Sequence, residues 1–157
     1  MSATAPEPLL RTRKMPIALQ WLESWQGFQF NLNLEYSDIS NKSAASFDAW
    51  ATQIDRLASL PNAYCKLSGM PQTFAQHGWQ TSDFVPYIHH ALKAFGARRV
   101  NFAGNWFVLD EQKWGYSKGT YRRMFNAVRG ALVQLNTTRA DMVDIFSGTA
   151  TRLYRLQ

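Results

Sequence analysis

The feature that most constrains the fold is a regular exchange of strand-like and helix-like segments. Residues 28–35, Phe-Gln-Phe-Asn-Leu-Asn-Leu-Glu, alternate between apolar and polar side chains, which is typical of a β-strand with one buried face. Two further strands are predicted at 63–68 and 100–104, and helical patterns at 46–60 and 83–95 separate the three. A helix between two strands makes the connection long enough for a crossover, and parallel neighbours need a crossover because a tight turn cannot join them. The sequence therefore predicts an α/β fold with a parallel sheet.

Further helices are predicted on both sides of these strands. Residues 16–26 form a helical pattern before the first strand, and residues 120–135 form one after the third. A shorter helix opens at 137–141, and Gly148 is expected to separate it from a last helix at the C-terminal end. Ser46 and Ser82 are expected to cap the two helices between the strands.

Composition indicates a globular protein, since 46% of the residues are hydrophobic and 14% are aromatic. Residues 1–14 are expected to be a disordered lead-in to one domain that covers residues 15–157. The single cysteine, Cys65, excludes an internal disulfide and favours a reduced, cytoplasmic setting. No run of apolar residues is long enough to predict a membrane-spanning helix. The net charge of +6 is scattered and accompanies no nucleic-acid motif, so nucleic acid is an unlikely partner.

The strands are too polar on one side for a sheet buried between two helix layers. The first strand has a face of Asn, Gln and Glu side chains, and Asn101 and Asn105 share one parity of the third. Apolar residues that face outer helices and polar residues that face a lumen are typical of a barrel wall. A complete (β/α)₈ barrel has eight strands and about 250 residues. Three strands therefore predict a partial TIM barrel, namely its C-terminal portion.

Several separate stretches resemble one known family. They are Pro-Asn-Ala-Tyr-Cys-Lys-Leu-Ser-Gly at 61–69, Pro-Tyr-Ile followed by Ala-Leu and Ala-Phe-Gly within 86–96, Arg-Val-Asn-Phe-Ala-Gly-Asn-Trp at 99–106, and Ala-Thr-Arg-Leu-Tyr-Arg-Leu at 150–156. Their order and spacing resemble the C-terminal half of the amidohydrolase-related family, which includes sugar lactonases and dicarboxylate lactonases. The resemblance implies a distorted eight-stranded barrel that hydrolyses lactones or amides, in some members with a divalent metal.

The chain departs from that family where the family places its chemistry. The family pattern Gly-Ser-Asp-Trp-Pro corresponds to residues 103–107, so Asn105 stands where the family has an aspartate. An amide can orient water or a carbonyl, but it neither takes a proton nor binds a cation well. The family's His-x-His pair has no counterpart, because the histidines are His77, His89 and His90. No metal ligand is predicted, and a divalent metal is expected only if an N-terminal half supplies the ligands.

The predicted site combines three catalytic candidates with surrounding polar residues. The matching family lysine implies that Lys66 faces the lumen, where it would hold a substrate carboxylate or polarise a substrate carbonyl; the alternative is a structural ion pair, for example with Glu35. Glu35 is the candidate base, and Asn105 would orient the substrate or water. The residues expected to bind substrate around them are Asn33, Ser68, His77 and Trp106.

Three other residues carry expectations of their own. Cys65 alternates away from Lys66 and is expected to pack under the helices as an inert small hydrophobe. His89 and His90 point about 100° apart on one helix, so they are not expected to chelate a metal together. Both are expected to be exposed to solvent.

Two function hypotheses follow. The first is a hydrolase that acts on a small-molecule lactone or similar carbonyl substrate and is incomplete as this chain, so that a missing barrel half or a second copy must complete it. The alternative is a non-catalytic, degenerate barrel remnant that acts through self-association or partner binding, because unpaired edges of a sheet invite pairing.

Overall fold

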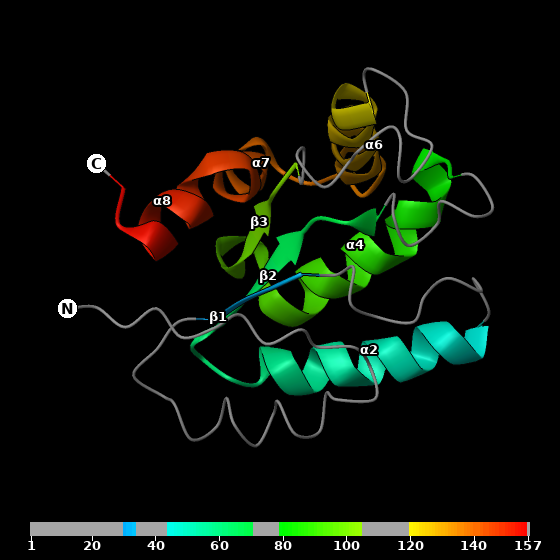
Figure 1. Ribbon diagram of the computed structural model, residues 1–157, viewed down its shortest axis with the longest axis horizontal. Coiled ribbons are helices and arrows are strands. Elements are labelled where there is room, and N and C mark those ends of the chain that lie inside the picture. The colour runs from blue at the N-terminus through cyan, green and yellow to red at the C-terminus, as the bar shows by residue number, and fades with distance from the viewer. Residues whose placement is uncertain (1–29, 34–43, 71–78, 105–119, 157) are drawn as a thin grey trace.

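The computed structural model of the protein describes residues 30–33, 44–70, 79–104 and 120–156 (Figure 1). Three parallel strands form one sheet in the order β1-β2-β3, and they are β1 (Phe30–Asn33), β2 (Ala63–Leu67) and β3 (Val100–Phe102). Each lies inside a strand that the sequence predicts. The predicted α/β class with a parallel sheet is therefore confirmed, whereas the lead-in at 1–14 and the helix at 16–26 lie outside the described residues.

Helices join and follow the strands. They are α2 (Ala44–Ala58), α4 (Thr81–Phe95), the 3-10 helix η4 (Ala97–Arg99), α6 (Thr120–Gln134), α7 (Arg139–Val143), the π-helix η5 (Asp144–Gly148) and α8 (Thr149–Tyr154). In Figure 1, α4 lies between α2 and α6, and η5 and α8 pack against β3. None of the helices in the described ranges is long and apolar enough to cross a bilayer.

Two of the predicted helix caps are wrong. Ser46 lies inside α2, which begins at Ala44, because the alanines at its start are strong helix formers. Ser82 lies inside the first turn of α4, whose N-cap is Gln80. The Asp83 side chain fixes this earlier start, since its Oδ2 accepts a hydrogen bond of 2.9 Å from the backbone N–H of Gln80.

Gly148 does not separate two helices as the sequence suggested. Its φ of −57° and ψ of −41° are helical, so the chain continues from η5 into α8 without a break. The glycine is explained by the lack of space for a side chain at this position and not by a helix break. A Cβ at this position would lie 2.5 Å from Asp144 Oδ1 and 3.1 Å from an Arg152 nitrogen, and these two side chains form an ion pair of 2.7 Å.

The core lies between one face of the sheet and the helices. Along β2 the buried residues are Ala63, Cys65 and Leu67, and the register sets Cys65 beside Val100 and Leu67 beside Phe102. Large apolar side chains from three helices complete the core, and they are Trp50, Ile54 and Leu57 from α2, Phe84 and Ile88 from α4, and Val128 and Leu132 from α6. One face of the sheet is therefore apolar and is covered by helices, as the alternation predicts.

Arg99 connects the ends of two helices to the sheet. It ends η4 directly before β3, and its side chain is partly buried. Its guanidinium nitrogens donate hydrogen bonds to four backbone carbonyls, namely those of Ala58 (3.0 Å), Leu60 (2.9 Å), Ala63 (3.3 Å) and Phe95 (3.2 Å). These carbonyls lie at the C-terminal ends of α2 and α4, in the turn between α2 and β2, and at the start of β2. A cation at helix C-termini is also favoured by the helix dipoles.

We expect Arg99→Met to lower the free energy of unfolding by about 3 kcal/mol, because several charge-assisted hydrogen bonds to partly buried carbonyls are lost. Urea denaturation measures this loss. Arg98→Met is the matched control: Arg98 is the adjacent, exposed residue, so its replacement is expected to change stability by less than about 0.5 kcal/mol. Equal losses in the two variants would contradict the role of Arg99.

Cys65 packs in the core with 1% of its surface exposed, so its expected role as a small buried hydrophobe is confirmed. Burial raises the pKa of the Cys65 thiol from 9.0 to about 12. A raised thiol pKa means that the folded state keeps the thiol neutral while the unfolded chain ionises it. The resulting stabilisation is complete below pH 9 and is lost as the pH rises toward 12.

Between pH 9 and pH 10.5 the unfolding free energy of the protein is therefore expected to fall more steeply than that of Cys65→Ala, by at most about 1.4 kcal/mol per pH unit. The pKa of Tyr87 is also raised, by burial and by the nearby Asp83 carboxylate, but Tyr87 is present in both proteins. Urea titrations at several pH values give the two slopes. Parallel slopes would show that the thiol ionises in the folded state.

Candidate functional site

A row of register-paired polar positions crosses the sheet, and two of its residues, Lys66 and Asn101, lie on the face opposite the apolar core. The register pairs Asn33 of β1 with Lys66 of β2, and Lys66 with Asn101 of β3. Neighbouring strands lie about 4.8 Å apart, so the three positions are side by side. Successive residues of a strand face opposite sides, and the neighbouring Cys65 and Val100 face the helices. The sheet thus brings together two predicted site residues, Asn33 and Lys66, and adds Asn101.

Lys66 is partly buried in this row. None of the described residues accepts a hydrogen bond from its ammonium group or forms an ion pair with it. An ammonium group has three N–H donors and no acceptor, so it suits a carbonyl or carboxylate oxygen. The alternative ion pair with Glu35 stays a prediction, because Glu35 lies outside the described residues.

Asn101 is more deeply buried than Lys66, with 3% of its surface exposed. No donor in the described part of the chain reaches its side-chain Oδ1. A buried acceptor without a donor costs about 1–3 kcal/mol, so this atom calls for a partner. The sequence shows that Asn101 has the parity of Asn105, but only the strand register shows that it stands beside Lys66. The predicted site residues did not include it for that reason.

Ser68 directly follows β2 and is completely buried. Its backbone N–H donates to the carbonyl of Lys66 at 2.9 Å, and the next residue, Gly69, has a φ of +68° that favours glycine. The chain therefore turns sharply at the C-terminal end of β2, which is the edge where barrel enzymes place their chemistry. Substrate binding by Ser68 stays a prediction, as it does for Asn33 at the end of β1.

The other predicted site residues cannot be placed. Glu35, His77, Asn105 and Trp106 all lie outside the described residues. In the described ranges no group of three or more His, Cys, Asp or Glu side chains could hold a metal ion.

His90 corrects one expectation. His89 is exposed as predicted, but His90 is partly buried where α4 packs on α2. Its Nε2 lies 2.9 Å from Asp55 Oδ1 and 3.2 Å from the carbonyl of Ala51, and its ring contacts Trp50 at a centroid distance of 5.5 Å. Both oxygens are acceptors, so Nε2 carries the proton. His90 thus has a structural role at the α2–α4 contact, which the sequence spacing within α4 could not show.

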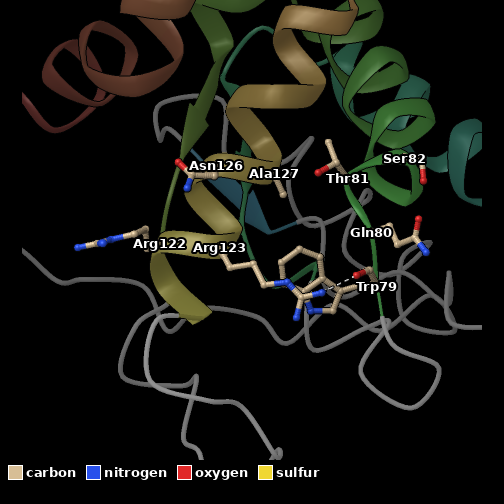
Figure 2. Close-up of a pocket in the computed structure, with 8 residues that line it drawn as sticks. All are labelled: Trp79, Gln80, Thr81, Ser82, Arg122, Arg123, Asn126 and Ala127. Carbon is tan, nitrogen blue, oxygen red and sulfur yellow. Dashed lines mark hydrogen bonds between the residues drawn. The ribbon is translucent and has the colours of Figure 1, made fainter.

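A cavity of about 670 Å³ lies between the first turns of α4 and α6 (Figure 2). Its described lining consists of Trp79, Gln80, Thr81, Ser82, Arg122, Arg123, Asn126 and Ala127. The Arg123 guanidinium lies 4.0 Å from the centroid of the Trp79 ring and donates a hydrogen bond of 2.8 Å to the Trp79 carbonyl. Arg122 extends from α6 away from this contact (Figure 2). The described lining contains no strand residue, so this cavity does not include the row of Lys66.

We expect Arg123→Gln to destabilise the protein by about 1 kcal/mol, because the cation–π contact and the hydrogen bond that join α6 to the start of α4 are lost. Thermal unfolding followed by circular dichroism measures the loss. Arg122→Gln removes the same charge from the adjacent exposed position and is expected to leave the melting temperature unchanged within about 1 °C. The expectation fails if the two variants melt at the same temperature.

Comparison with known proteins identifies the class. Residues 36–156 match the family model described as amidohydrolase, so the chain belongs to the amidohydrolase family. This confirms the resemblance found in the sequence to the C-terminal half of that family.

The similar proteins are longer than this chain. An uncharacterised protein, y4mH, of Sinorhizobium fredii is 26% identical over 123 residues, which are 78% of this chain and 38% of that protein. Two crystal structures of an amidohydrolase from Burkholderia multivorans, one with bound HEPES and one with bound zinc, are 22% and 23% identical. Both have a TM-score of 0.81 and match 94% of this chain, but only 52% and 51% of their own chains. The chain thus has an amidohydrolase fold over about half the length of these solved relatives.

Proposed function

We propose that this chain forms the Lys66-bearing part of the active site of a hydrolase that acts on lactone-type or amide-type carbonyl substrates. The observation that carries the proposal is the register that sets Asn33, Lys66 and Asn101 side by side, with Lys66 and Asn101 on the face opposite the apolar core. A partly buried ammonium group without a protein partner among the described residues is suited to bind the oxygen of a carbonyl group. Membership of the amidohydrolase family supports the reaction class.

Lys66 would stabilise the negative charge that develops on the carbonyl oxygen when water attacks the carbonyl carbon. A positioned donor in a water-poor site stabilises that charge more in the transition state than in the bound substrate. In the same proposal Glu35 is the base that takes the proton of the attacking water, and Asn105 orients the water or the substrate. Asn33, Ser68, His77 and Trp106 would line the substrate around these groups.

The sheet would be part of a TIM barrel. Within the described residues β1 and β3 each pair with one strand only, namely β2, so each keeps one backbone edge for a further strand. The solved relatives have about as many residues outside the matched region as inside it. We therefore propose that further strands complete the barrel, either from the rest of a longer chain or from a second subunit.

The test is hydrolysis of a panel of lactones by the native full-length protein. The rate is measured as the acid that is released while the pH is held constant. Lys66→Met keeps the length of the side chain and removes its charge, and we expect it to lower kcat/KM by about 100-fold or more. Lys93→Met is the matched control, because Lys93 is exposed on α4. Equal activity of the two variants, or no activity of the native full-length protein on any lactone or amide, would refute the proposal.

A further inference from the structure

Asn101 and Lys66 have complementary, unmet hydrogen-bonding needs. Asn101 presents a buried Oδ1 acceptor that no described donor reaches, and Lys66 presents an ammonium group that no described acceptor reaches. The register sets the two residues side by side on β2 and β3. In a sheet, the nearest side chains on one face are those of in-register neighbours.

We propose that Asn101 is a positioning residue for Lys66, and that its Oδ1 accepts a hydrogen bond from the Lys66 ammonium group. The inference rests on the proposed function, because it assigns Asn101 to the same site. It also goes further, since it says what fixes the direction of the ammonium group on a face that offers it no carboxylate in the described part of the chain.

The chain geometry allows this bond. A lysine side chain is a flexible chain of four carbons, and the two strand backbones lie about 4.8 Å apart. The Lys66 nitrogen can therefore reach the neighbouring Asn101 amide by rotation about side-chain bonds alone. The bond supplies the donor that Asn101 lacks. It uses one of three ammonium N–H groups and leaves two for a substrate carbonyl oxygen. A neutral acceptor restrains the ammonium group without forming the strong ion pair that a carboxylate would form.

An experiment can distinguish the positioning role of Asn101 from a purely structural role. If Asn101 only stabilised the fold, its replacement by Leu would lower stability and leave the reactivity of Lys66 unchanged. A positioning residue predicts the reverse. Asn101→Leu removes a buried acceptor and fills similar space, so stability is retained, while the ammonium group loses the bond that holds it.

The experiment is acetylation of the full chain with an N-hydroxysuccinimide ester at one pH, with the rate at each lysine read by peptide mass spectrometry. The reagent attacks an amine that is not held in a hydrogen bond, so we expect Asn101→Leu to speed acetylation of Lys66 about tenfold. Asn101→Asp, which provides a charged acceptor, is expected to slow it by at least as much. Lys93 is the internal control, and its rate should change by less than about twofold in every variant.

The result is decisive in either direction. Opposite shifts of the Lys66 rate in the Leu and Asp variants, with an unchanged Lys93 rate, support the proposal. Equal Lys66 rates in all three proteins, or shifts in the same direction, overturn it. If Asn101→Asp does not fold, Asn101→Thr keeps an acceptor oxygen and must hold the Lys66 rate within about threefold of the native rate. Lactone turnover is not part of this readout, so a chain without hydrolase activity would refute the proposed function and leave this bond to be decided by acetylation alone.

Discussion

The hydrogen bonds of Arg99 hold together the parts on which the rest of the structure depends. One guanidinium group contacts the end of α2, the turn into β2 and the end of α4, and Arg99 itself is followed at once by β3. A planar group with five donors can serve several carbonyls at once, and a lysine ammonium cannot match that fork. One side chain, two residues before Asn101, thus fixes two helices and two strands relative to one another.

From that arrangement follows a sheet with two unlike faces. The face with Cys65 and Val100 is sealed by helices, and burial keeps the Cys65 thiol neutral. The other face carries Lys66 and Asn101, which keep hydrogen-bonding capacity that the described residues do not use. Buried polar groups that have no partner in the folded protein lower its stability, and function is the usual reason for retaining them.

The sequence predicted most of the local structure and little of what connects distant segments. Strand alternation and helix periodicity located β1, β2, β3, α2, α4 and α6, because these patterns repeat within a few residues. The capping of α4 by Asp83, the pairing of His90 with Asp55 and the pairing of Lys66 with Asn101 were not predicted. Each depends on which side chains meet in three dimensions, as does the role of Arg99, which in sequence is one member of a basic pair. For the site, parity gave the correct face of the sheet, but only the register showed which polar residues are neighbours.

The strand order has a consequence for how this chain acquires its structure. Each strand pairs with the one that precedes or follows it in sequence, so neighbours in space are neighbours in order. Each connection between paired strands contains a helix, as from Phe30 to Ala63 and from Lys66 to Asn101, and the entropy lost on closing it is smaller than for strands that lie still farther apart in the chain. Such a sheet can grow by one strand–helix unit at a time, in the direction in which a ribosome releases the chain. The same stepwise growth leaves an open edge after every addition, so each intermediate exposes the surface that the next unit must cover.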